Sequence, residues 1–155
     1  MQIQPSKITL RNANITTTNK HALYNEGTAN VESGTYETTS TYTLYNTSSS
    51  AILNITGGTI RCGGQYAVYV IGKLNISGNP TISNTYNDTS SAAVYVNGTA
   101  AIEGGTFTAT KGYAVYKYSG TLTISGGNMS NESTSSPALY NRSGNATISG
   151  GNITT

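Results

Sequence analysis

Apolar residues recur along the chain in short groups that alternate with polar residues. Groups such as Ala67-Val68-Tyr69 end in a tyrosine six times, at Tyr24, Tyr45, Tyr69, Tyr95, Tyr116 and Tyr140. A second group follows each tyrosine, as in Leu53-Asn54-Ile55, and a third apolar position follows that, as at Ile60. Alternation with a period of two predicts strands with one buried face. The tyrosines recur about every 23 residues, so the chain is a repeat with three strands per unit.

Paired glycines separate the second and third groups, as at Gly57-Gly58 and Gly126-Gly127. A tight corner needs backbone angles that only glycine adopts at low cost, so these pairs predict a turn. The stretch after the third group varies in length, which predicts loops that project at that corner. Equivalent groups superpose only if successive units are parallel. We therefore predict an all-β fold, a right-handed three-sided parallel β-helix of about seven coils, as one domain over residues 1–155.

The alternation also assigns a direction to individual side chains. Leu53, Ile55 and Ile60 are expected to point inward, and so is Cys62, with a structural role. His21, which has no metal-binding or catalytic neighbour in the pattern, is expected at the surface. The six repeated tyrosines point either outward or inward, and the outward direction is favoured because the Leu or Val beside each one is typical of a core position. Such a column is either an aromatic ladder that stabilises the stack or a stripe that contacts sugars or another rod.

Charges are few, and two pairs of them support this alignment. Arg11 and Glu32 occupy equivalent positions one coil apart, and so do Glu37 and Arg61, so each pair is expected to lie side by side.

Composition narrows the fold and the function further. Thr, Ser, Asn and Gly make up 79 of the 155 residues, and there are eight Lys or Arg and six Asp or Glu. The scarcity of helix formers excludes a helical bundle. A net charge of +2 gives no basic surface for nucleic acid. The single cysteine excludes an intrachain disulfide, and no apolar stretch reaches the roughly 18 residues of a membrane helix, so we expect no membrane insertion.

The predicted register does not bring residues of a catalytic type close together. Glu32 and Glu103 share a column but lie three coils apart, about 14 Å, which is beyond the roughly 5 to 9.5 Å that separates a pair of glycosidase carboxylates. His21 is the only histidine, so no Ser-His-Asp set exists, and no zinc or calcium spacing occurs. Charges interrupt the threonine rows that an ice-binding solenoid needs. We expect no enzymatic activity, no metal and no cofactor.

The sequon Asn-x-Ser/Thr is the one abundant short motif. It begins at Asn14, Asn46, Asn54, Asn75, Asn87, Asn97, Asn128, Asn131, Asn141, Asn145 and Asn152. Outward strand positions that alternate Asn with Thr would produce the motif without any sugar. N-glycosylation is therefore one of two interpretations.

The two ends of the chain carry no polar capping segment of the kind that solenoids need for solubility. The pattern starts near Ile8 in a second group and stops just after Ile153 in a third group. We expect both ends to be uncapped, with unpaired strand edges and an open apolar core. Contact between copies would then involve Ile8, Leu10, Ile148 and Ile153, and would propagate end to end. A segment cut from a longer solenoid would have the same ends.

Rows such as Ala138-Leu139-Tyr140-Asn141 and Gly120-Thr121-Leu122-Thr123-Ile124-Ser125-Gly126-Gly127 resemble the parallel β-helix repeats of microbial surface proteins. These proteins include adhesin-like proteins of bacteria and methanogenic archaea and, more distantly, the polymorphic outer-membrane proteins. The resemblance covers nearly the whole chain and carries over no catalytic residue. It implies an extracellular or cell-surface scaffold that displays loops and contacts carbohydrate or a surface protein.

These observations lead to two hypotheses of function. The first is a non-enzymatic, adhesin-like surface module whose six repeated tyrosines contact the ligand. The second is a structural subunit of an extracellular filament that assembles end to end.

Overall fold

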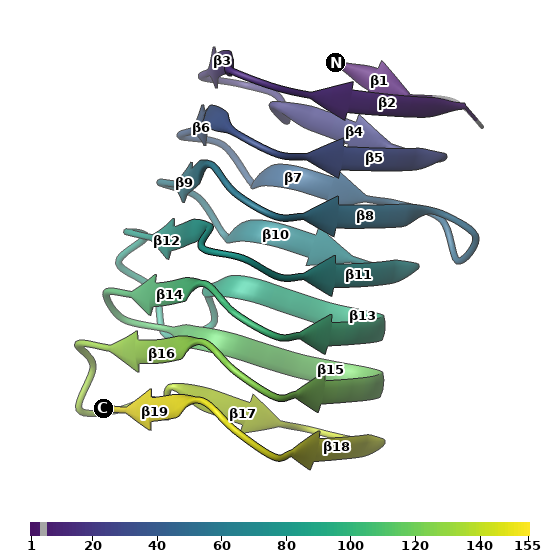
Figure 1. The fold of residues 1–155 in the computed structure, drawn as a ribbon. Helices are drawn as coiled ribbons and strands as arrows, with labels where there is room; N and C mark the ends of the chain where they lie inside the picture. The colour runs from purple at the N-terminus through teal and green to yellow at the C-terminus, as the bar shows by residue number, and fades with distance from the viewer. Residues whose placement is uncertain (4–5) are drawn as a thin grey trace.

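The chain is a parallel β-solenoid in the computed structural model, which describes residues 1–3 and 6–155. Residues 4–5 of the predicted domain lie outside the described residues. Three strands follow one another in each turn, and the turns stack along one axis (Figure 1). Neighbouring strands along each face are parallel, and no helix occurs in the described residues. The predicted all-β parallel solenoid is confirmed.

The strands form three faces. The first face contains β1 (Gln2–Ile3), β4 (Leu23–Asn25), β7 (Tyr42–Asn46), β10 (Tyr66–Val70) and β17 (Leu139–Asn141). The second face contains β2 (Lys7–Leu10), β5 (Thr28–Val31), β8 (Ile52–Ile55), β11 (Lys73–Ile76) and β18 (Asn145–Ile148). The third face is a 7-stranded sheet of β3 (Ala13–Thr17), β6 (Gly34–Thr38), β9 (Thr59–Cys62), β12 (Thr81–Asn84), β14 (Thr106–Ala109), β16 (Asn128–Asn131) and β19 (Asn152–Thr154).

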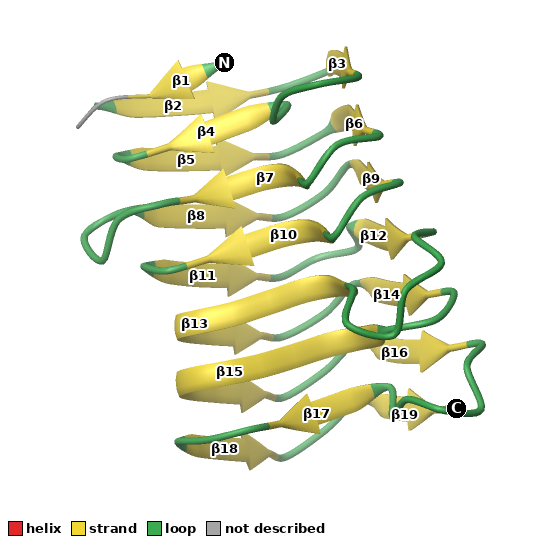
Figure 2. Cartoon of the chain, turned by 180° about the vertical axis from the view of Figure 1, so that it is seen from behind, coloured by secondary structure: helices red, strands yellow, loops and turns green. Residues whose placement is uncertain are grey.

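Two long strands, β13 (Ala92–Ile102) and β15 (Tyr113–Ile124), run from the first face onto the second without a turn. They join these two faces into one 12-stranded sheet. In Figure 1 the strands of the second face run to the left in front, and those of the first face run to the right behind them as the chain descends; Figure 2 shows the reverse side. This winding is right-handed.

We number the corners in chain order: the first follows the first face, the second follows the second face, and the third follows the third face.

Successive turns lie in the register that the repeat predicts. Tyr69 is paired with Tyr95 of the next turn. Leu53 is paired with Leu74 in the same way. The sequence repeat and the structural repeat therefore coincide.

The inward residues of the three faces form one continuous core. It includes Leu53, Ile55, Ile60 and Phe107, none of which is exposed. Cys62 is buried among them, as predicted, and its Sγ accepts a hydrogen bond from the N–H of Gly64 at 3.2 Å. Burial raises the pKa of the Cys62 thiol. The thiol therefore behaves as a small core side chain.

The second corner depends on glycine, as the paired glycines predict. Gly58 and Gly127 have φ values of 91° and 95°, a region that side chains with a Cβ rarely adopt. Gly34 stands at the same corner with φ 109°, and a Cβ there would lie 2.0 Å from the carbonyl oxygen of Ala13. Close stacking of one turn on the next therefore requires a residue without a side chain at this position.

Buried asparagines close the core at the first corner. Asn25 and Asn46 each follow a tyrosine of the first face, and neither is exposed. The Nδ2 of Asn25 donates to the Oδ1 of Asn46 at 2.7 Å and to the Ile52 carbonyl at 2.9 Å. Asn46 in turn donates to the carbonyls of Ala51 and Lys73 at 3.1 and 3.2 Å. These bonds satisfy backbone carbonyl groups of Ala51 in the turn after β7 and of Ile52 and Lys73 at the starts of β8 and β11.

The corner residue changes with the turn that it closes. Val70 and Val96 occupy the position of Asn46 on the next two turns, where the chain passes to the second face with a short turn or none. Lys117 follows at the same position and is not exposed. Its Nζ donates to the carbonyl of Ser143, and burial lowers the pKa of this amine. The corner residue is therefore polar on some turns and apolar on others, and each buried polar one is hydrogen-bonded to at least one backbone carbonyl group.

One of the two predicted charge pairs forms an ion pair. The Arg11 guanidinium donates to the Glu32 carboxylate, with Nη2 at 3.2 Å from Oε1. This hydrogen bond lowers the pKa of Glu32. Glu37 and Arg61 are paired across β6 and β9, as predicted, but the side chains of these two described residues form no ion pair. Exposed pairs of this kind add little to stability.

Candidate functional site

Ten tyrosines gather on the first face, and we call them the tyrosine stripe. They are Tyr24, Tyr42, Tyr45, Tyr66, Tyr69, Tyr95, Tyr113, Tyr116, Tyr118 and Tyr140. Six of them are the repeated tyrosines of the sequence. They point away from the core, as predicted, because the residues on either side of them, such as Leu44 and Asn46, are the buried ones.

A second column of rings, not predicted from the sequence, lies beside the first. Tyr42, Tyr66 and Tyr113 each precede a repeated tyrosine by three residues, whereas Ala92 takes this place on one turn. Tyr66 lies with its ring centroid 5.5 Å from that of Tyr42 and 4.5 Å from that of Tyr95. Because some turns lack the ring, this column is not a strict repeat in the sequence.

His21 extends the second column by one turn. Its ring stacks on Tyr42 with centroids 5.5 Å apart and an interplanar angle of 9°. The Nδ1 atom lies 2.9 Å from the carbonyl oxygen of Tyr42. The side chain is half-buried: His21 lies at the surface of the first face, packed against the rings of the stripe. The signal that could have indicated this contact is the spacing of 21 residues from His21 to Tyr42.

A β-bulge adds Tyr118 to the stripe. The register between β13 and β15 shifts after Val96, which is paired with Lys117, whereas Asn97 is paired with Ser119. The additional residue is Tyr118, and its ring centroid lies 5.8 Å from that of Tyr95. A bulge redirects a side chain in this way.

Most ring faces in the middle of the stripe are covered by other rings. Tyr69 stacks on Tyr95 with centroids 4.8 Å apart and an angle of 9°, and on Tyr42 at 4.7 Å and 21°. The Tyr45–Tyr69 and Tyr95–Tyr116 contacts are edge-to-face, both at 89°. These arrangements are the ones that aromatic pairs prefer, so the stripe stabilises the stack of turns. What it offers to a partner is mainly ring edges and hydroxyl groups.

Burial among the rings changes the phenols as well. Tyr66 and Tyr95 are 7% and 8% exposed, and this burial raises the pKa of both hydroxyl groups. Both hydroxyl groups are therefore uncharged at neutral pH. The stripe combines apolar ring edges with hydrogen-bonding groups.

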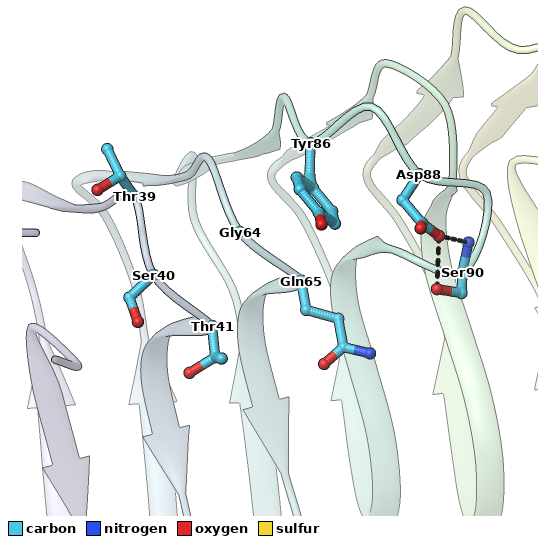
Figure 3. Close-up of a pocket in the computed structure, with 8 residues that line it drawn as sticks. All are labelled: Thr39, Ser40, Thr41, Gly64, Gln65, Tyr86, Asp88 and Ser90. Carbon is cyan, nitrogen blue, oxygen red and sulfur yellow. Dashed lines mark hydrogen bonds between the residues drawn. The ribbon is translucent and has the colours of Figure 1, made fainter. Parts of the chain in front are cut away.

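A hollow of about 330 Å³ lies at the third corner, where the strands of the stripe begin. It is lined by Thr39, Ser40, Thr41, Gly64, Gln65, Tyr86, Asp88 and Ser90. Figure 3 shows Tyr86 and Asp88 on the overlying loop, and Thr41 and Gln65 at the starts of neighbouring strands. The residues that follow Thr41 and Gln65 are Tyr42 and Tyr66 of the stripe. The hollow and the stripe are thus adjacent.

The sequon asparagines divide by accessibility. Asn46 and Asn131 are buried, and their amides donate to carbonyl groups, so this fold has no room for a sugar on either. Three more are half-buried, namely Asn54, Asn75 and Asn97. The exposed ones are Asn14, Asn87, Asn128, Asn141, Asn145 and Asn152. Glycosylation remains a prediction for the exposed group.

The residues predicted for end-to-end contact differ in exposure. Leu10 is buried at 7% and Ile8 is half-buried, whereas Ile148 and Ile153 are 50% and 39% exposed. The two exposed isoleucines lie on β18 and β19 in the last described turn.

Within the part of the chain that the structure describes, no cluster of three or more His, Cys, Asp or Glu side chains could hold a metal ion. The same residues include no helix with the length and apolar character needed to cross a membrane. Comparison of the chain with protein-family models, curated proteins and solved structures gives no match.

Proposed function

We propose that this protein is a non-enzymatic, adhesin-like display module of the cell surface or the extracellular space, which contacts glycan or surface protein through the tyrosine stripe. The observation that supports the proposal is the concentration of ten tyrosines on one face of a solenoid that is otherwise rich in Thr, Ser and Asn. Tyrosine is enriched at protein interfaces because it combines a large apolar ring with a hydroxyl group.

The packing of the rings favours such a role. Rings in the middle of the stripe are held between neighbours on the turns above and below, as Tyr69 is held between Tyr45 and Tyr95. Side chains that are already ordered lose little conformational entropy when a partner binds. The cost of association is lower for such a surface than for a set of mobile side chains.

A binding comparison tests the proposal. The probes are a glycan array and immobilised cell-surface protein, and the variant is Tyr24→Phe, Tyr45→Phe and Tyr116→Phe together. This variant keeps the rings that support the stack and removes hydroxyl groups that the stripe offers to a partner. We expect binding to fall by roughly tenfold or more, since hot-spot hydroxyls and rings dominate interface energies.

The matched control is Tyr86→Phe, which removes a hydroxyl group outside the stripe. It should leave stripe-mediated binding unchanged. Equal binding by the wild type and the triple variant, with circular dichroism spectra that agree, would contradict a role for the stripe.

A second candidate function is a subunit of an extracellular filament, and the exposure of Ile148 and Ile153 favours it. The last described turn presents an apolar end face and a row of unpaired strand groups, which a second copy could extend. Further turns of the same chain would cover this face equally well. Light scattering and electron microscopy of the 155-residue protein separate the two: rods that grow with concentration and disappear on Ile153→Lys support assembly, whereas a monomer at high concentration refutes it.

A further inference from the structure

Stacking on a sugar requires a ring face that no other ring covers. Tyr86 has one: it is 43% exposed, and no other aromatic ring of the described residues contacts it. This distinguishes it from Tyr69 and Tyr95, whose faces lie against each other. Tyr86 also lies at the edge of the hollow at the third corner rather than on the flat of a face (Figure 3).

The loop that carries Tyr86 is held by its own hydrogen bonds. The Oδ1 of Asn84 accepts the N–H of Tyr86 at 3.0 Å. The Oδ1 of Asp88 accepts both the N–H and the hydroxyl of Ser90, at 2.7 and 2.6 Å, and Ser91 donates to the Asp88 carbonyl at 2.7 Å. These bonds order the backbone at Tyr86 and the carboxylate of Asp88 before any ligand binds.

The same network fixes the loop relative to the turn beside it. Asn84 is buried, and its Nδ2 donates to the carbonyls of Gly64 and Gln65 at 2.8 and 3.2 Å. Gly64 leaves the floor of the hollow without a side chain, because a Cβ there would lie 1.2 Å from the carbonyl oxygen of Ser40. The hollow is thus a consequence of backbone packing and not of mobile side chains.

Three polar groups around the hollow are not engaged with the rest of the protein. The Oδ2 of Asp88, the side-chain amide of Gln65 and the hydroxyl of Thr41 have no hydrogen-bond partner among the described residues. The hydrogen bonds from Ser90 lower the pKa of Asp88, so its carboxylate is charged at neutral pH. A carboxylate and an amide that line the same hollow can each bond to a hydroxyl group of a sugar.

The residues around the hollow include no lysine and no arginine. A phosphate, a sulfate or an acidic sugar would meet the Asp88 carboxylate without a compensating positive charge, which disfavours binding of an anion. The hollow spans three turns, from Thr39 to the loop at 86–90. At about 4.8 Å for each turn, its length is about 10 Å, enough for roughly two linked sugars.

We propose that the hollow at the third corner is a binding site for a neutral saccharide. The apolar face of one sugar ring lies on Tyr86, and two adjacent hydroxyl groups bond to Asp88 and Gln65. The second sugar extends toward Thr41 and the start of the tyrosine stripe. The inference rests on the proposed function in one respect, namely that the ligand is a glycan. It assigns the sugar to this hollow, and it leaves the stripe to stabilise the solenoid and to contact a larger partner.

Titration of the 155-residue protein with neutral disaccharides tests this assignment. The probes are cellobiose, maltose, lactose and mannobiose, followed by calorimetry and by saturation-transfer NMR, with sialyllactose as the anionic comparison. We expect binding of at least one neutral disaccharide and weaker binding of the acidic one. Tyr86→Ala should reduce the affinity by roughly tenfold or more, as expected when a stacking ring is lost.

Two further variants separate a role in binding from a role in folding. Tyr86→Phe keeps the ring face and should bind nearly as the wild type does. Asp88→Asn keeps an oxygen that can accept the bonds from Ser90 but removes the charge, and it should also lose affinity while the thermal unfolding curve stays unchanged. Glu103→Gln, which neutralises an exposed carboxylate at the second corner, outside both the hollow and the stripe, is the control that should not alter disaccharide binding.

Two results would overturn the assignment. One is equal affinity of the wild type and Tyr86→Ala, and the other is no binding of any neutral disaccharide in the panel. The proposed function is tested separately, by the stripe variants with the surface-protein probe. The failure of one proposal can therefore be told from the failure of the other.

Discussion

Replacement of Asn46 by Val tests whether the buried amides hold the first corner. Asn46 is not exposed, accepts a bond from Asn25 at 2.7 Å and donates to two carbonyls at 3.1 and 3.2 Å. Valine is close in shape and already stands at this position on the next turn, as Val70. The loss of three hydrogen bonds at about 1 kcal/mol each, partly offset by the added apolar burial, predicts a loss of about 2 to 3 kcal/mol.

The assay is equilibrium unfolding in urea, followed by circular dichroism, with the slope of the transition checked for constancy. The matched control is Asn54→Val. Asn54 also belongs to a ladder of amides, since it donates to Asn30 at 2.8 Å and accepts from Asn75 at 2.7 Å, but it is half-buried on the outer face. Water replaces its bonds, so this change should cost less than about 1 kcal/mol. Equal losses in the two variants would refute the reasoning.

Three further predictions follow from the same geometry. Gly34→Ala places a Cβ 2.0 Å from the backbone of the adjacent turn, at a φ of 109°, and should lower the unfolding free energy by about 3 kcal/mol or more. The control Gly63→Ala, whose Cβ would lie 3.5 Å from its nearest neighbouring atom, should be close to neutral. Equal melting curves for the two variants would contradict this prediction. The unfolding free energy should fall as the pH rises above about 10, because burial raises the pKa of Tyr66 in the folded protein and the unfolded chain therefore loses its phenolic proton first. In urea titrations at alkaline pH, Tyr66→Phe should make this fall less steep. The same dependence of the unfolding free energy on pH in the wild type and the variant would count against the prediction. Cys62 should react with a thiol reagent only as fast as the protein opens, so labelling at the rate of a free thiol in the folded state would disprove its burial.

The repeat in the sequence was sufficient to predict the fold. Each turn must place an apolar residue at the same inward position, so Leu53, Leu74 and their equivalents recur at a fixed spacing. The glycine requirement at the second corner is equally local, because the backbone angle of Gly58 belongs to that residue alone. Properties that every turn must satisfy are visible as a period.

Features that differ from turn to turn could not be predicted in this way. The second column of rings is interrupted by Ala92, and Tyr118 joins the stripe only because a bulge shifts the register by one residue. The burial of Lys117 depends on the turn at Ser143, which is distant in the sequence. The hollow beside Tyr86 likewise depends on how one loop lies over the turn beside it. Such contacts arise between turns and leave no periodic signal.

The two long strands also have a mechanical consequence. The hydrogen bonds that join successive turns run along the solenoid axis, so a load along this axis would open them one strand at a time, beginning with the shortest strands. β13 and β15, with 11 and 12 residues, are paired around the first corner and share the largest interface between turns. Under tension this pair should be the last to separate, and it would act as a clamp between weaker turns on either side.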